Sequence, residues 1–218
     1  MLTLHLVRHG QTNFNAERRV QGQHDSVLDD VGIAQAEELR SSIEALAPSA
    51  VYSSSNVRAK HTADILTANM PIEVECLDSL REIYMGPWQE RLWHDVAETE
   101  TIQFTNFMGQ PNRFSIEGAE TFAELQTRGV GAIEEIISCE CAKLSSGSTT
   151  NALEVLIVSH GAILKTIMAH YANVPIAHMW TEPHLENCSH STLHIDTEGN
   201  RRLRTICGES VRGTIWDS

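Results

Sequence analysis

The sequence has no long hydrophobic run, and its apolar stretches fall far short of the ~18 residues that a membrane-spanning helix needs. The N-terminus lacks a basic segment followed by an apolar stretch and a cleavage site, so a secretory signal is not expected. The five cysteines are an odd number without CxxC spacing, which argues against a disulfide framework and against a cysteine zinc site. We therefore expect reduced thiols, a cytoplasmic location and no membrane contact.

Positive charge is also scarce, because Lys and Arg number 16 whereas Asp and Glu number 29, giving a formal net charge of −13. The overall field of such a chain repels nucleic acids and anionic membranes, so neither is expected as a partner. A small anion would have to be bound by a few well-placed arginines that overcome this field locally. Arg8 and Arg58 are the candidates for that role.

Two apolar segments stand out, LTLHLVRHG at residues 2–10 and LEVLIVSHG at residues 153–161. Both are short and rich in Val, Ile and Leu, which is typical of buried strands in a parallel sheet. Ligands of such sheets bind outside the carboxyl ends of the strands. The sequence therefore predicts that Arg8, His9 and His160 meet at one rim of the sheet.

The remaining pattern alternates between helices and strands. Helices are expected at 30–46, after the capping residues Ser54 and Ser55, at 120–143 and at 162–171. Strands are expected at 50–53, 190–196 and 203–207, a short edge strand with a turn at 71–82, and loops at 11–28 and 145–151. Residues 88–119 are broken by glycine and proline and are expected to form a small helical excursion over the rim. We predict an α/β fold, a three-layer α/β/α sandwich with a mostly parallel central sheet, in a single domain of residues 1–218.

The side chains at the expected rim have complementary chemistry. Guanidinium groups present fixed donor forks that match phosphate oxygens. A histidine between them can attack phosphorus and carry the group covalently. Positioned cations stabilise the charge of the transferred phosphoryl group. The leaving alkoxide needs a proton donor, and Glu82, which follows Leu80 and Arg81, is the candidate.

The segment LVRHGQTNFN, residues 6–15, resembles the signature of the histidine phosphatase superfamily, also called the phosphoglycerate mutase-like family. Further segments follow in the family's order: QGQHDS at 21–26, SSSNVRAKHTA at 53–63, LREIYMGPW at 80–88, EGAET at 117–121, VSHGAIL at 158–164 and NCS at 187–189. A lone RHG would be a weak signal, whereas this ordered set is specific and covers nearly the whole chain.

The resemblance implies a role for each residue of the rim. His9 would be the nucleophile that becomes phosphohistidine. Arg8, Arg58 and His160 would hold the phosphoryl oxygens. Glu82 would protonate the leaving group and then take a proton from the attacking water.

A second set of residues would complete the substrate site. Asn15 would add a polar contact, and Gln21 with Gly22 would shape the substrate entrance. The backbone amide of Gly161, near a helix start, would face the anion. No metal and no other cofactor is implied, because the arginines would take the place of a metal.

The family contains both phosphatases and mutases, so the motif does not fix the reaction. Cofactor-dependent mutases of the family carry a longer excursion with a Tyr-Gly and basic cluster, whereas Arg91 and Arg113 are the only Lys or Arg residues of this excursion. The stretch looks more like that of phosphatase-type members, which often show Trp-Glu-Gly there, although Gln89, Glu90 and Arg91 depart from this pattern. In length and in NAERRVQGQ, residues 15–23, the sequence is nearest to bacterial members labelled probable phosphoglycerate mutases.

A mutase must retain a second anionic group, which requires cations beyond the first phosphate site. We therefore predict a metal-independent phosphomonoesterase that acts on a small phosphorylated metabolite. The alternatives are a phosphoglycerate mutase and, from another class, a catalytically silent phosphate-binding module. A homodimer is the expected assembly. The aromatic residues of the excursion either line the substrate pocket or anchor the excursion to the sheet; they are Trp88, Trp93, Phe104 and Phe107.

Overall fold

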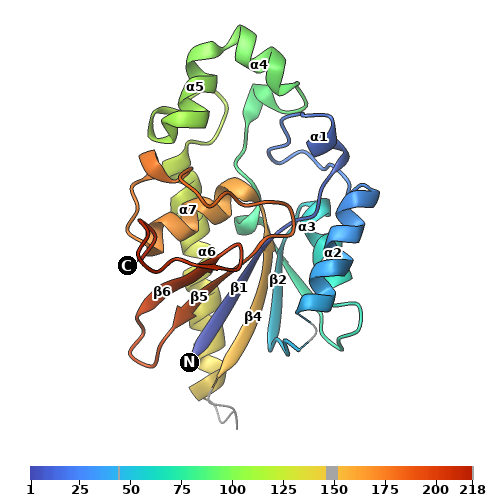
Figure 1. Ribbon diagram of the computed structural model, residues 1–218, viewed down its shortest axis with the longest axis vertical. Coiled ribbons are helices and arrows are strands. Elements are labelled where there is room, and N and C mark those ends of the chain that lie inside the picture. Colours follow the sequence, from blue (N-terminus) through green and yellow to red (C-terminus); the bar gives the residue numbers. More distant parts are fainter. Residues whose placement is uncertain (44, 146–151, 218) are drawn as a thin grey trace.

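A computed structural model describes residues 1–43, 45–145 and 152–217 of the chain (Figure 1). In these ranges the strands are β1 (Leu2–Arg8), β2 (Ala50–Ser54), β3 (Val74–Leu77), β4 (Leu153–Ser159), β5 (His190–Ile195), β6 (Arg201–Ile206) and β7 (Glu209–Ser210). The helices are α1 (Asn13–Ala16), α2 (Asp30–Ser42), α3 (Val57–Leu66), α4 (Trp93–Thr99), α5 (Thr101–Gly109), α6 (Phe122–Ser145) and α7 (Gly161–Tyr171). Short 3-10 helices lie at Asp78–Leu80, Gly86–Trp88, Pro111–Arg113 and Ile176–His178. The loop expected at 145–151 lies, except for its first residue, outside the described residues.

The described strands form one seven-stranded sheet in the order β3-β2-β4-β1-β5-β6-β7. The half β3-β2-β4-β1 is parallel, and β5, β6 and β7 extend it by antiparallel pairs. β1 pairs with β4 along its whole length, with Arg8 opposite Ser159. The residues that follow these two strands, His9 and His160, therefore leave the sheet at the same level.

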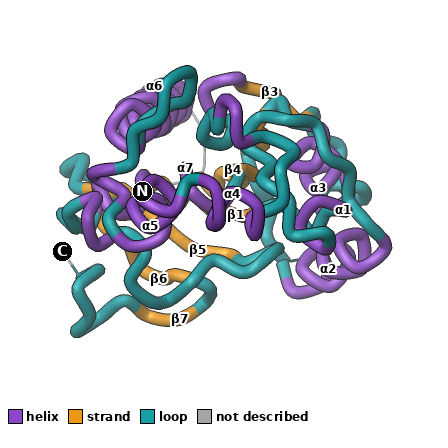
Figure 2. The backbone as a smooth tube through the Cα atoms, turned by 90° about the horizontal axis from the view of Figure 1, so that it is seen from above, coloured by secondary structure: helices purple, strands orange, loops and turns teal. Residues whose placement is uncertain are grey.

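Helices cover both faces of the sheet (Figure 2). They bury the apolar side chains that the central strands direct alternately to one face and to the other. Leu2, Leu4 and Leu6 of β1 pack in the larger core, which includes α6 and α7. Val7 points to the opposite face and joins a second core with residues of α3 such as Ala63. The chain thus has the predicted three-layer α/β/α architecture.

The predicted excursion also forms, and α4 and α5 lie beyond the carboxyl ends of the parallel strands (Figure 1). Trp88 is fully buried at its base and packs on Phe107 and Phe114. Its indole Nε1 donates a hydrogen bond to Glu100, 2.7 Å away. An aromatic cluster therefore fixes the excursion above the rim.

Three local expectations were wrong. The helix expected at 30–46 ends at Ser42, where the hydroxyls of Ser41 and Ser42 bond to carbonyls of the last turns and compete with the helical pattern. The expected loop after β1 contains α1, which a reciprocal hydrogen-bond pair between Thr12 and Asn15 caps. The cap of α3 is Asn56 rather than Ser54 or Ser55.

The close approach of α2 to the segment after His9 depends on Gly32. A Cβ atom at this position would lie 2.0 Å from the Gln11 carbonyl oxygen. We expect Gly32→Ala to lower the free energy of unfolding by about 1–3 kcal/mol, because the backbone must shift to admit the methyl group. Urea unfolding at neutral pH measures the change.

Gly131 in α6 provides the matched control, because no described atom beyond the backbone of its own helix and its chain neighbours lies within 4 Å of a Cβ built there. Gly131→Ala should raise the free energy of unfolding by ~0.5–1 kcal/mol through helix propensity alone. Equal shifts of the same sign in the two variants would contradict the close approach of α2.

Candidate active site

Two buried histidines lie side by side where β1 and β4 end. His9 is 3% exposed and His160 is fully buried, and their ring centroids are 5.1 Å apart. The His9 amide donates to the carbonyl of Ser159, 3.0 Å away, which links the ends of the two strands. Asn187 Nδ2 donates to the His9 carbonyl at 2.9 Å, so the backbone around His9 is held from both sides.

The hydrogen bonds of His9 leave one ring nitrogen as a nucleophile. Nδ1 donates to the carbonyl of Gly10 at 2.7 Å, which places the lone pair on Nε2. Arg58 Nε lies 3.3 Å from Nε2 and donates to it. Burial, followed by the positive charges of Arg58 and Arg8, lowers the pKa of His9 well below 6.5. The imidazole is therefore neutral at physiological pH, as a nucleophile must be.

Arg58 is almost completely buried and is fixed by backbone carbonyls. Nη1 donates to His24 at 2.8 Å and Nη2 to Gly22 at 2.7 Å. Burial lowers the pKa of Arg58 to about 10, so the group stays cationic at neutral pH. Gly22 has φ +53°, and a Cβ there would meet Gln89 Oε1 at 2.5 Å. Glycine is required at this turn, and its carbonyl orients Arg58.

His160 and Arg8 each have a buried nitrogen without a hydrogen-bond partner among the described residues. The Ser54 hydroxyl donates to His160 Nε2 at 2.8 Å and accepts from the Asn56 amide at 3.2 Å. His160 Nδ1 and Arg8 Nε are buried without a hydrogen-bond partner, although Arg8 Nη1 donates to the Leu185 carbonyl. These nitrogens are the donors that phosphoryl oxygens between the two side chains would satisfy.

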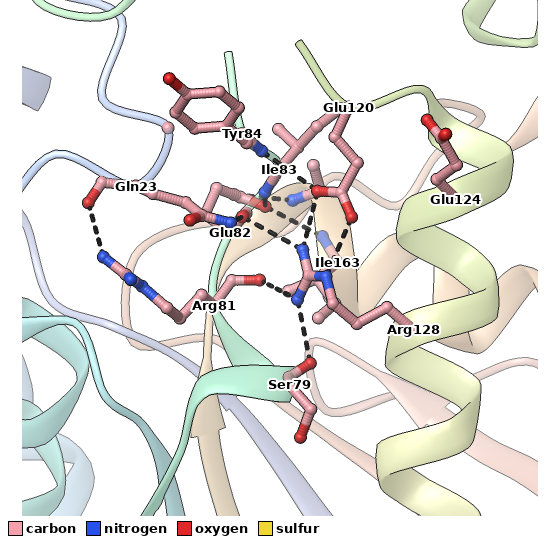
Figure 3. Close-up of polar contacts among 12 residues, drawn as sticks. Gln23, Ser79, Arg81, Glu82, Ile83, Tyr84, Glu120, Glu124, Arg128 and Ile163 are labelled. Carbon is pink, nitrogen blue, oxygen red and sulfur yellow. Dashed lines mark hydrogen bonds and ion pairs between the residues drawn. The ribbon is translucent and has the colours of Figure 1, made fainter. Parts of the chain in front are cut away.

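Glu82 is held at the N-terminus of α7 (Figure 3). Its Oε1 accepts from the amides of Ile83 at 2.9 Å and Ile163 at 3.1 Å, and its Oε2 accepts from Ala162 at 3.1 Å. The amides at the N-terminus of α7 thus bind the Glu82 carboxylate. Gly161 is the first residue of the helix, and a Cβ there would lie 3.5 Å from Arg8 Nε.

Asn15 and Gln21 come from the segment after β1 and share the Thr12 hydroxyl. The Asn15 Oδ1 accepts from the Thr12 amide at 3.1 Å, and Gln21 Oε1 lies 2.9 Å from Thr12 Oγ1. Because these amide oxygens are occupied, the amide nitrogens are the groups that remain for a substrate.

The expected site residues border two adjoining cavities of about 160 and 250 Å³, which share Arg8 and Glu82. The smaller is lined by Arg8, His9, Asn15, Arg19, Val20, Gln21, Gly22, Arg58, Glu82, Ile83, Met85, Trp93, Phe107 and Ala162. Gly161 lines the other cavity, and His160 packs against His9. A larger cavity of about 690 Å³ near α2 and α3 has Arg40 as its one charged side chain among the described residues, so size does not identify the site.

Sequence patterns missed two residues of this site. Ser54 orients His160, but the sequence suggests only a helix cap for it. Arg19 lines the smaller cavity and forms an ion pair with Glu17, whereas Arg91 of the excursion bonds to Glu100 instead. No sequence pattern marks Arg19 as a site residue. Its place at the cavity follows from the path of the loop after β1 in the structure.

The aromatic residues of the excursion take both of the roles left open by the sequence. Trp93 and Phe107 line the cavity, and Trp88 anchors the excursion. Phe104 packs on Trp93 away from the smaller cavity.

The histidine phosphatase superfamily (branch 1) model matches residues 4–207, and the chain belongs to this superfamily. It is 37% identical over 166 residues to the metal-independent phosphoserine phosphatase of Arabidopsis thaliana, covering 74% of this chain and 65% of that protein, just under two thirds of its length. It is 32% identical over 195 residues to the probable phosphoglycerate mutase GpmB of Salmonella paratyphi C, covering 88% and 85%. The solved structure of Bacillus stearothermophilus YhfR matches with a TM-score of 0.85 and 32% identity over 93% of this chain and 95% of that one.

These comparisons confirm the family expected from the ordered motifs. The protein is an enzyme of the histidine phosphatase type. The names of its relatives include both a phosphatase and a mutase, which are the two reactions that the sequence left in competition.

The electrostatics of His9 lead to a pH prediction. Because its pKa is lowered, the neutral ring persists below pH 6.5, and the acidic limb of kcat/KM should lie below that value. Two-bond ¹H–¹⁵N spectra of histidine-labelled protein should show a neutral ring protonated at Nδ1 at pH 6.5. In Arg58→Gln the pKa of His9 should rise, since a neighbouring positive charge is lost. A protonated His9 Nε2 at pH 6.5 in the unmodified protein would contradict this assignment.

Proposed function

We propose that the protein hydrolyses phosphate monoesters of small metabolites through a phosphohistidine on His9. The observation that carries this proposal is the geometry around His9. Arg58 Nε lies 3.3 Å from its Nε2, His160 packs against its ring, and Arg8 and Glu82 line the same cavity. A module that only binds phosphate would have no need of Glu82 in the same cavity.

In the first step His9 Nε2 attacks phosphorus, and the bond between phosphorus and the leaving oxygen breaks. Arg8, Arg58 and His160 donate to the equatorial oxygens and stabilise their charge. Glu82 in its protonated form transfers its proton to the leaving oxygen, so that a neutral alcohol departs.

In the second step water attacks the phosphorus of phosphohistidine. The Glu82 carboxylate takes a proton from the water, the Nε2–P bond breaks, and inorganic phosphate leaves. His9 and Glu82 return to their starting protonation states, so the cycle needs no further reactant.

The charges around the cavities favour hydrolysis over a mutase reaction. Outside the phosphoryl site, the cationic side chains lining the cavities are Arg19 and Lys165. Arg19 forms an ion pair with Glu17, which offsets its charge, and burial lowers the pKa of Lys165 to about 8, so its charge is more easily lost. Little positive charge remains to retain a bisphosphorylated intermediate.

The mutase is the second candidate, because the GpmB relatives carry the name of probable phosphoglycerate mutases and match most of the chain. For the hydrolase, phosphoserine and other small phosphate monoesters are the first substrates to assay, given the name of the Arabidopsis relative.

One assay separates the two reactions. Phosphate release from a panel of monoesters, run beside 3-phosphoglycerate isomerisation, should show release without efficient isomerisation. His9→Ala should lose at least about 10³-fold in kcat, because the covalent step is removed. Rapid quenching under non-acidic conditions with ³²P-labelled substrate should trap label on His9. Efficient isomerisation without phosphate release would replace the hydrolase with the mutase.

A metal is not needed if the arginines supply the positive charge. We expect turnover to be unchanged after incubation with EDTA and dialysis, within roughly twofold, because the cations in this mechanism are side chains. Added Mg²⁺ or Zn²⁺ serves as the control. An activity that EDTA abolishes and a divalent metal restores would contradict the proposed mechanism.

Within 1–43, 45–145 and 152–217, no helix combines the length and the apolar character needed to cross a bilayer. The homodimer and the cytoplasmic location stay predictions. Sedimentation of the purified chain and fractionation of the source cell test them.

A further inference from the structure

We propose that Arg128 and Glu120 form a positioning pair that sets the place of Glu82 toward the leaving group. The inference rests on the proposed function of Glu82 as the acid. Neither residue of the pair lines the two cavities, so they would act through Glu82 and without touching the substrate.

Arg128 extends from α6 to the segment 79–84, which carries Glu82 (Figure 3). Its Nη1 donates to the carbonyls of Ser79 at 2.9 Å and Arg81 at 2.8 Å. Its Nη2 donates to the carbonyl of Glu82 at 3.3 Å. One guanidinium group thus fixes the backbone at Glu82 and at the residue before it.

Glu120 fixes the same segment beyond Glu82. Its carboxylate accepts from Arg128 Nε at 2.9 Å and from Arg128 Nη2 at 2.8 Å. The Tyr84 amide donates to Glu120 Oε2 at 3.1 Å, and the Glu120 amide donates to the Tyr84 carbonyl at 2.8 Å. The pair therefore holds the backbone on both sides of Glu82.

The Glu82 side chain is oriented from the opposite direction, by the amides at the N-terminus of α7. Its backbone carbonyl also accepts from Gln23 Nε2 at 3.0 Å. The carboxyl group can reach both the α7 amides and the cavity only while the 79–84 backbone stays at its present distance from α7. The contacts of Arg128 and Glu120, together with the bond from Ser159 Oγ to the Leu80 carbonyl at 2.7 Å, hold the backbone at that distance.

The chemistry of arginine explains why this position would not accept a lysine. The planar guanidinium serves three carbonyls and a bidentate carboxylate at once, whereas an ammonium group has three donors at one point. Burial is the main cause that lowers the pKa of His160, and the positive charge of Arg128 is the smallest of several further contributions. Arg128→Lys keeps this positive charge and removes the fork, so it separates geometry from electrostatics.

A second ion pair on α6 provides a matched control. Arg201 of β6 donates through Nε and Nη2 to Glu134, in the same bidentate manner. Within the described part of the chain, these two side chains form no hydrogen bond or ion pair with the 79–84 segment, and they lie outside both active-site cavities. Arg201→Lys therefore breaks a comparable pair on the same helix without reaching Glu82.

The test compares kcat/KM for two kinds of phosphate monoester, because kcat/KM reports the first phosphoryl transfer. An alkyl phosphate needs a proton on its leaving oxygen, whereas p-nitrophenyl phosphate releases a stable anion. We expect Arg128→Lys to lower kcat/KM by about 10–100-fold for the alkyl ester and by less than roughly threefold for the aryl ester. Glu120→Gln should give the same pattern, and Arg201→Lys should give no such difference.

A double-mutant cycle with Glu82→Gln completes the test. Once Glu82 is replaced, Arg128→Lys should cause no further loss on the alkyl ester, because the pair acts only through that acid. Equal losses on both esters, or a full additional loss in the Glu82→Gln background, would overturn the positioning role. If Glu82→Gln itself shows no dependence on the leaving group, the proposed function of Glu82 fails instead. Thermal unfolding of each variant confirms that folded protein is compared, and Glu120→Gln preserves the test if Arg128→Lys does not fold.

Discussion

The in-register parallel pairing of β1 with β4 is the constraint on which the site depends. It places Arg8 opposite Ser159, so the next residues of both strands emerge together and the two imidazoles pack with their centroids 5.1 Å apart. Because α7 begins directly after His160, the same register also places its first amides beside Glu82. A shift of one residue would turn the apolar side chains of β1 to the wrong face and separate the histidines.

The site also concentrates positive charge in a strongly acidic protein by giving its arginines neutral partners. Arg58 donates to the carbonyls of Gly22 and His24, and Arg8 donates to that of Leu185. Among the described residues neither forms a salt bridge. Carbonyl dipoles orient a guanidinium and leave its net charge available to an anion. Burial, together with these same charges, keeps His9 neutral, so the arginines that bind phosphate also help to activate the nucleophile.

The sequence predicted the parts of the site that depend on strand ends. Short apolar runs locate β1 and β4, and the helix pattern places Arg58 near the start of α3. Residues whose position depends on long-range contacts were not found, because no periodic pattern marks them. Ser54 contacts His160 across the sheet, and Arg128 reaches the 79–84 segment from the middle of a long helix. The short elements α1 and β7 were missed for the related reason that they contain too few residues to show a period.

The two halves of the proposed chemistry are thus supported by different parts of the fold. Sheet register fixes the phosphoryl site, whereas Glu82 belongs to the segment 79–84, which is held by contacts to α6 and α7 and to Gln23. The cavity walls that would face the leaving group are formed by Trp93 and Phe107 of the excursion. Side chains of those walls can change without altering either the strand register or the contacts that hold the acid. This separation gives a physical reason why one superfamily includes relatives named for different reactions while the core around His9 stays recognisable in sequence.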